Sequence, residues 1–188
     1  MFVRFKVLSK TAIERIQAEF PKYPDRRSLT LPALRIAQEE IGYLSQPAMI
    51  DIAELLDLTP IQVYDVATFY SQHNMNPTGT YLIQVCKTLA CSLVGARSIV
   101  AHLQDKLGIA IGETTEDGLF TLKVVECLAA CGSAPMMQIN HRYYEQLTPA
   151  KVDQILNDLK QQGKSDLASG PFMLPVLHGS SLRGEEQE

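Results

Sequence analysis

The sequence Cys86-Lys-Thr-Leu-Ala-Cys91, followed by Cys127-Leu-Ala-Ala-Cys131, contains all four cysteines of this 188-residue chain. Each pair comes directly after a run of apolar and β-branched residues typical of a strand, at residues 81–85 and 120–125. Two neighbouring strands would bring both loops to one end of a sheet, where the four thiols converge. Four cysteine thiolates are the ligand set of a zinc ion or of an iron–sulfur cluster.

Spacing alone does not choose between zinc and a cluster, because C-x4-C and C-x3-C loops can serve either. Small residues crowd the second loop, from Ala129 to Ala134. They favour a cluster, because backbone N–H groups must approach its sulfurs closely, although they would also suit an ordinary tight turn. A helix expected to start near Leu93 would add a favourable dipole. Two disulfides would require an oxidising compartment, for which the sequence gives no sign.

Further motifs surround the cysteines. They are Cys86-x4-Cys91-Ser-Leu-x-Gly95-Ala96, Gly112-Glu-Thr-Thr-x-Asp117-Gly118-x-Phe120-Thr-Leu-x-x-Val125-Glu126 and Cys127-Leu-x-Ala130-Cys131-x-x-Ala134-Pro135. With these motifs the chain resembles, from about Ser9 to Lys160, the thioredoxin-like [2Fe–2S] ferredoxin family, and within it the 24-kDa-type (E) subunits of respiratory complex I. Two positions depart from the family pattern: Ala129, where glycine is common, and His141, where an acidic residue is common.

The resemblance implies an electron carrier that holds one [2Fe–2S] cluster, with Cys86 and Cys91 on one iron and Cys127 and Cys131 on the other. It implies a redox subunit of NADH:quinone oxidoreductase without a substrate site of its own. FMN and NAD are expected only in a partner, the NADH-binding flavoprotein subunit, and other peripheral-arm subunits of complex I are expected as neighbours. No nucleophile elbow, phosphate-binding glycine loop or dinucleotide fingerprint occurs in the sequence.

Two alternative functions stay open on the sequence. The same module can serve an NAD-reducing hydrogenase or a formate dehydrogenase, since the family supplies both kinds of complex. A structural zinc domain with four cysteine ligands, acting as an interaction module, is the other alternative.

Composition and charge limit the possible partners and the cellular location of the chain. A net charge of −4 and a pI near 5.6, without a cluster of Lys or Arg, argue against a nucleic-acid partner. The first eight residues lack the uninterrupted apolar core of a secretory signal, and no apolar run is long enough to span a membrane. We therefore expect a cytoplasmic protein without direct membrane insertion, peripheral to the inner membrane as part of its complex.

We expect an α+β protein in three parts: a helical bundle at 1–76, a thioredoxin-like [2Fe–2S] domain at 77–162, and a tail at 163–188 that is disordered or bound to a partner. The polar stretch 71–79 marks the boundary between the first two parts. His73 lies in this stretch, and we interpret it as a loop or packing residue because four cysteines already complete a ligand set. The apolar tail segment 172–177 is expected to extend over the partner.

Four helices are predicted in the first part, beginning at a capping box Thr11-Ala-Ile-Glu14, near Pro32, after Ser45, and at Thr59-Pro60. The last is apolar on more than one face. The favoured interpretation is that the additional apolar side chains are buried within the chain. The alternative is that a partner subunit covers them.

The second part is predicted as a small mixed sheet with flanking helices. Its elements are a strand at 80–86, a helix ending at Gly108, a strand at 119–126, a hairpin at 136–145, and a helix from Thr148-Pro149 to Gly163. Thioredoxin-like folds often place a cis-proline directly before such a hairpin, so the bond preceding Pro135 is expected to be cis.

Overall fold

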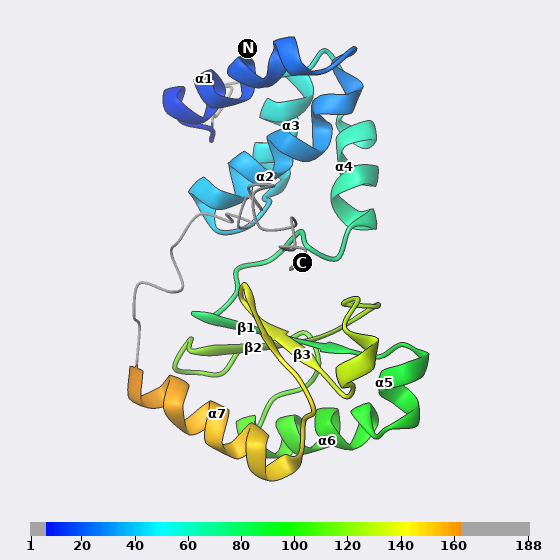
Figure 1. The fold of residues 1–188 in the computed structure, drawn as a ribbon. Helices are drawn as coiled ribbons and strands as arrows, with labels where there is room; N and C mark the ends of the chain where they lie inside the picture. Colours follow the sequence, from blue (N-terminus) through cyan, green and yellow to red (C-terminus); the bar gives the residue numbers. More distant parts are fainter. Residues whose placement is uncertain (1–6, 163–188) are drawn as a thin grey trace, which may run out of the picture.

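The structure, a computed structural model, describes residues 7–162. Four helices form the first group of elements, which we call the helical module (Figure 1). They are α1 (Lys10–Glu19), α2 (Thr30–Ile41), α3 (Gln46–Leu55) and α4 (Pro60–Phe69), with short 3-10 turns at η1 (Phe20–Lys22) and η2 (Arg27–Leu29). The predicted tail, including segment 172–177, lies outside the described residues.

Local signals set most of these helix ends. Ser45 caps α3 through its hydroxyl, which accepts a hydrogen bond from the N–H of Ala48, and Thr59 forms a capping box with Gln62. Gly42 ends α2 in the left-handed conformation, at φ 89°. The predicted helix starts after Ser45 and at Thr59-Pro60 are confirmed.

The predicted start of α1 is wrong by two residues. The cap is Ser9, whose hydroxyl oxygen accepts a hydrogen bond from the N–H of Ala12 at 3.1 Å, and Thr11 lies inside the helix. Ser9 is held in place by Glu40 of α2, which accepts from its backbone N–H at 2.9 Å and from its hydroxyl at 2.6 Å. A contact between residues distant in sequence therefore selects this cap over the local capping box.

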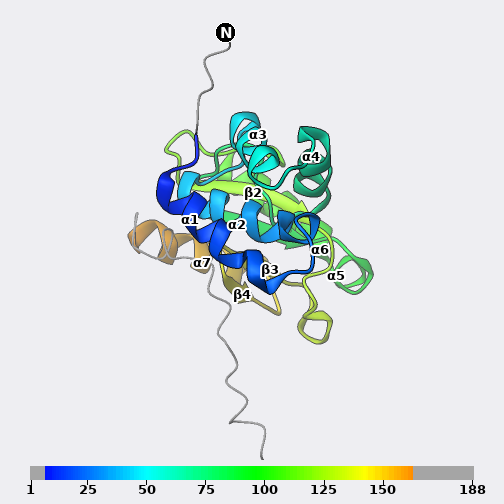
Figure 2. The same cartoon turned by 90° about the horizontal axis from the view of Figure 1, so that it is seen from above.

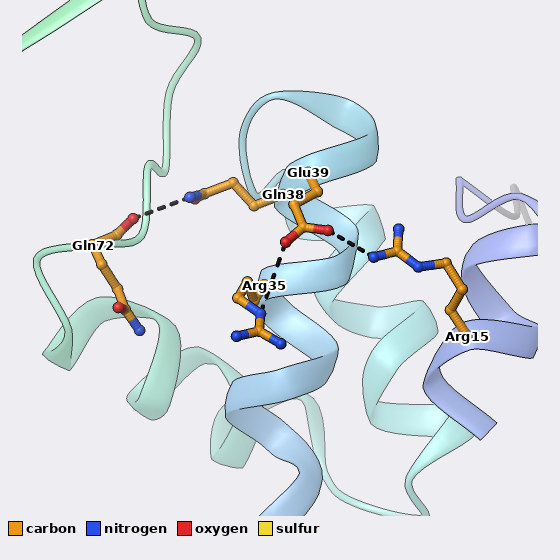
Figure 3. Close-up of polar contacts among 5 residues, drawn as sticks. All are labelled: Arg15, Arg35, Gln38, Glu39 and Gln72. Carbon is orange, nitrogen blue, oxygen red and sulfur yellow. Dashed lines mark hydrogen bonds and ion pairs between the residues drawn. The ribbon is translucent and has the colours of Figure 1, made fainter. Parts of the chain in front are cut away.

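The polar side of α2 connects it to its neighbours (Figure 3). Glu39 accepts a hydrogen bond from Arg15 of α1 at 2.7 Å and lies 3.8 Å from Arg35. The side-chain N–H of Gln38 donates to the carbonyl of Gln72, just beyond α4, at 3.0 Å. The bundle interior is apolar, with Leu34, Ile52 and other side chains from all four helices in one buried cluster.

A four-stranded sheet with three helices forms the second group, the sheet module. Its elements are β1 (Tyr81–Cys86), α5 (Leu89–Leu93), α6 (Ala96–Leu107), β2 (Phe120–Val125), η3 (Cys131–Ser133), β3 (Met137–Ile139), β4 (Arg142–Tyr144) and α7 (Pro149–Gln162). The strand order is β2-β1-β3-β4, with β1 parallel to β2 and the other pairs antiparallel. The predicted mixed sheet and the α+β class are confirmed.

One face of the sheet packs on α6 and α7, and the other face lies towards the helical module (Figure 1). Phe120 and Leu122 of β2 belong to the same buried cluster as Leu103 of α6 and Val152 of α7. Within residues 7–162, no helix has the length and apolarity needed to cross a membrane.

Helix α4 departs from the favoured prediction. Val63 and Ala67 are buried against the bundle, but Ile61, Tyr64 and Phe69 are 61%, 47% and 79% exposed. Burial within the chain is therefore wrong for these three side chains. An exposed row of large apolar groups on one helix is the kind of surface that partner proteins cover.

His73 packs against the end of α4 and takes no part in the cysteine loops, as predicted. It is buried, its Nδ1 lies 3.3 Å from the carbonyl oxygen of Ala67, and its Nε2 has no hydrogen-bond partner within the described residues. Burial lowers the pKa of His73, although the backbone carbonyls of Ala67 and Val66 favour the protonated form.

This burial predicts a pH dependence. Because the pKa of His73 is lower in the folded state, the unfolded chain takes up the proton first as the pH falls through about 6.5. Stability of the helical module should then decrease below that pH, by at most about 1.4 kcal/mol per pH unit for one proton. Thermal unfolding followed by circular dichroism between pH 7.5 and 5 would measure it. His73→Ala should flatten this part of the profile; an equally steep profile in the variant would contradict the assignment to His73.

Candidate metal centre

The two cysteine loops lie at the same end of the sheet, after the last residues of β1 and β2. Because β1 and β2 are adjacent and parallel, both strands end together, and Cys86 pairs in register with Val125. The N–H of Lys87 continues the ladder by donating to the carbonyl of Val125 at 3.0 Å. Cys91 lies in the short helix α5, and Cys131 begins the 3-10 turn η3.

The two loops contact each other directly. Cys86 and Cys91 are buried in a small cluster with Ala96 and Met136, and Leu128 and Ala130 of the second loop pack against it. The burial of Cys86 raises its pKa. Hydrogen bonds to its sulfur from the hydroxyl of Thr88 and the backbone N–H of Leu128 outweigh this effect, so that its net pKa lies below the ordinary value. The second loop therefore covers the buried thiols of the first.

The second thiol pair lies at the surface. Cys127 Sγ and Cys131 Sγ are 3.8 Å apart, and the N–H of Ala129 donates to Cys127 Sγ at 3.3 Å. This is the separation that two thiolates adopt on one tetrahedral metal ion with bonds of about 2.3 Å. A hydrogen bond with Cys127 and the electrostatic interaction with that neighbouring sulfur raise the pKa of Cys131.

In the first pair, too, the neighbouring thiol affects the pKa of a cysteine. Burial, a hydrogen bond with Cys86 and the charges of Cys86 and Cys131 raise the pKa of Cys91. Within residues 7–162, no three His, Cys, Asp or Glu side chains gather closely enough to hold a single metal ion. Cys86 and Cys91 lie together in the buried cluster, and Cys127 and Cys131 lie together at the surface. Four sulfurs in two pairs, with backbone N–H donors beside them, fit a [2Fe–2S] cluster.

Two further contacts hold the loops together and were not predicted. Lys87 and Glu126 form an ion pair of 2.8 Å across the bases of the two loops. The hydroxyl of Tyr143 on β4 donates to the carbonyl of Leu128 at 2.8 Å. Positions 87 and 126 each follow the register pair Cys86–Val125, so the ion pair becomes predictable once the strands are known to be parallel neighbours.

The helix predicted to start near Leu93 begins three residues later, and a short helix that was not predicted precedes it. Leu93 is the last residue of α5, and the longer helix α6 begins at Ala96, after Gly95 in the left-handed conformation at φ 98°. The N-terminus of the long helix therefore lies just beyond the predicted position, because Gly95, which adopts positive φ, precedes it. The cis bond preceding Pro135 is confirmed.

Ala129, which departs from the family pattern, has the conformation that glycine adopts readily, with φ 63°. A Cβ is unfavourable in this region by about 1 kcal/mol. Ala129→Gly should therefore raise the free energy of unfolding by about that amount, as measured by denaturant unfolding of the sheet module.

The neighbouring Ala130, at φ −112°, provides the matched control for this prediction. There glycine relieves no strain and only adds freedom to the unfolded chain, so Ala130→Gly should lower stability by about 0.5–1 kcal/mol. Equal effects of the two variants would contradict the role assigned to φ at position 129.

The small mixed sheet, with paired cysteines at the ends of two parallel strands, defines a metal-binding protein of thioredoxin-like architecture. Comparison with known families makes the assignment specific. The chain belongs to the thioredoxin-like [2Fe–2S] ferredoxin family, whose profile matches residues 16–160. The family suggested by the cysteine motifs is thus confirmed.

Relatives of the chain are named as subunits of NADH dehydrogenases. A protein of Rhizobium meliloti, named as an E-type subunit of NADH-quinone oxidoreductase, is 43% identical over 80% of this chain and 89% of its own length. NADH-quinone oxidoreductase subunit 2 of Thermus thermophilus is 42% identical over 77% of this chain and 82% of its own. The mitochondrial NADH dehydrogenase [ubiquinone] flavoprotein 2 of Dictyostelium discoideum is 42% identical over 93% of this chain and 68% of its own.

Solved structures show a similar fold. An NAD⁺-reducing [NiFe]-hydrogenase in the air-oxidised state matches 71% of this chain with a TM-score of 0.60 and 22% identity. This chain spans about a quarter of the hydrogenase chain that it matches, 23% of its length. At 22% identity, this similarity shows a shared fold and nothing about function.

Proposed function

We propose that the chain is the electron-carrier subunit of an NADH:quinone oxidoreductase, with Cys86, Cys91, Cys127 and Cys131 as the ligands of one [2Fe–2S] cluster. The observation that carries the proposal is the meeting of the two cysteine loops, in which Leu128 and Ala130 of the second loop pack on the buried cluster that contains Cys86 and Cys91. Family membership and the names of the relatives support it.

The chain's own residues define what such a site can do. When bound, a [2Fe–2S] cluster accepts and returns one electron at a time. Cys86 and Cys91 would hold it from the buried side, and Cys127 and Cys131 from the exposed side. The N–H of Ala129, which already donates to Cys127 Sγ, would stabilise negative charge there.

The flavin and the nicotinamide are assigned to a partner, the NADH-binding flavoprotein subunit, and this chain acts without a substrate site of its own. Its sequence has no dinucleotide fingerprint to bind either group. As part of such a complex the chain would work on the cytoplasmic side, peripheral to the inner membrane, beside other peripheral-arm subunits.

Anaerobic purification tests the proposal. We expect a red-brown protein with two irons per chain and an electron-paramagnetic signal on reduction, together with co-purification of a flavoprotein subunit. A colourless protein with one zinc per chain would overturn it in favour of the structural zinc domain. Co-purification with hydrogenase or formate dehydrogenase subunits would keep the cluster and change the host complex.

Two exposed apolar surfaces are candidates for contact with this partner. One is the α4 face, defined as Ile61, Tyr64 and Phe69. The other is the α5 face, defined as Leu89 and Leu93, which are 75% and 77% exposed beside the cysteine loops. Helices α4 and α5 lie on the same side of the molecule in both views (Figures 1 and 2).

Substitutions on these faces should weaken assembly without unfolding the chain. Phe69→Asp and Leu93→Asp each place a charge in the proposed contact, and each should weaken binding of the flavoprotein subunit at least about tenfold, as measured by calorimetry. Ile111→Asp is the matched control, because Ile111 is also exposed but lies in the loop before β2. Unchanged affinity in both test variants would remove these faces from the interface.

A further inference from the structure

The two modules pack chiefly within themselves. Helices α1 to α4 contact one another, the strands contact one another and α6, and the buried apolar side chains of residues 7–162 fall into separate clusters in the two modules. Figure 1 shows the chain passing from one module to the other through the segment after α4. This segment, residues 70–80, is called the linker, and it makes contacts with both modules.

Asn74 anchors the linker to the helical module. It is buried, its N–H donates to Gln38 Oε1 at 2.6 Å, and its carbonyl accepts from the N–H of Leu44 at 2.7 Å. The other end of the Gln38 amide donates to the carbonyl of Gln72 (Figure 3). One side-chain amide of α2 thus holds the linker at two points, and the backbone of Asn74 is fixed on the helical side.

The side chain of Asn74 reaches the other module. Its Oδ1 accepts a hydrogen bond from Lys123 Nζ of β2 at 2.7 Å. Because Phe120 and Leu122 belong to the core under α6 and α7, the alternation of a strand places Lys123 on the opposite face of the sheet. The Lys123–Asn74 bond therefore crosses from the sheet to the linker, on the face that looks towards the helical module.

A lysine is unusual at a half-buried position of a strand such as that of Lys123 in β2. Burial lowers the pKa of Lys123, as expected where the charged form loses water. A buried ammonium is unfavourable unless it is hydrogen-bonded, whereas an apolar side chain would fill a strand position without that penalty. The hydrogen bond to Asn74 offsets this penalty, and it is directional, so that it depends on how the linker lies over the sheet.

We propose that the hydrogen bond between Lys123 and Asn74 is a latch that fixes the helical module in one orientation over the sheet. The latch holds the α4 face and the α5 face in the arrangement in which a single partner can cover both. This second statement rests on the proposed function. Preorganisation of this kind strengthens binding because the partner need not restrict the motion of the two modules.

Lys123→Met tests the latch in the full chain with its cluster, since it keeps most of the side-chain volume and removes the donor. Hydrogen exchange of linker residues 70–80 should accelerate roughly tenfold, while strands β1 and β2 exchange as before. Affinity for the flavoprotein subunit should fall by a similar factor. Lys106→Met is the matched control, because Lys106 loses an ion pair of 3.1 Å to Asp153 that lies within the sheet module.

Asn74→Ala, and the variant that carries both Lys123→Met and Asn74→Ala, complete a double-mutant cycle. If the two residues form the latch, the double variant should match the stronger of the single variants, whereas fully additive effects on linker exchange would overturn the pairing. Unchanged linker exchange in Lys123→Met would overturn the latch. Faster linker exchange with unchanged partner affinity would overturn its role in docking. A colourless unmodified protein would instead overturn the proposed function, and linker exchange would still decide the latch.

Discussion

Cys91→Ser is expected to abolish or severely destabilise the cluster, with loss of visible absorption and of iron in protein purified without oxygen. Metal ligation requires a thiolate, and a serine hydroxyl does not ionise near neutral pH as a thiol can. Cys91 is buried beside Cys86 in the apolar cluster under the second loop, so a hydroxyl there would also be a polar group without its intended partner.

His73→Ala is the control for this substitution. His73 is a possible metal ligand by type, but it packs against α4, away from the cysteine loops, so its removal should leave the absorption spectrum and the iron content intact. An unaltered spectrum in Cys91→Ser would remove that residue from the ligand set. Loss of the spectrum in His73→Ala would show that the helical module, and not the loops alone, holds the cluster.

Leu34→Ala and Leu122→Ala are expected to separate the stabilities of the two modules. Both leucines are fully buried, Leu34 in the helical cluster and Leu122 in the sheet cluster, and each truncation should cost about 2–5 kcal/mol within its own core. The chemical change is the same in both variants, so a difference between them reports the location of the residue and not the substitution.

The measurement uses two signals. Loss of visible absorption reports unfolding of the sheet module. Far-ultraviolet circular dichroism is dominated by helix and reports unfolding of the helical module more strongly. Leu122→Ala should lower the temperature at which absorption is lost and leave most of the helical transition in place, while Leu34→Ala should do the reverse. If either variant lowers both transitions together, the predicted boundary near residue 76 does not separate two cooperative units.

The candidate site could be predicted from sequence to a large extent. Paired cysteines after two strand-like runs are a local pattern, and β1 and β2 do end together, with Cys86 opposite Val125. The deviation at Ala129 was visible as a departure from the family, but its meaning required the backbone angle of φ 63°. The short helix α5 and the break at Gly95 that separates it from α6 were not predicted, because a glycine within a helical pattern is often tolerated.

The sequence by itself determined most of the helices and strands, because caps such as Thr59–Gln62 and the apolar periodicity of each element act over a few residues. It also placed the four thiols on two loops. Only the tertiary structure decided that Ser9 caps α1, that the α4 face is exposed, and that Lys123 meets Asn74. Each of these depends on contacts between residues more than 30 positions apart or on which surfaces the other elements leave uncovered, and no local pattern encodes either.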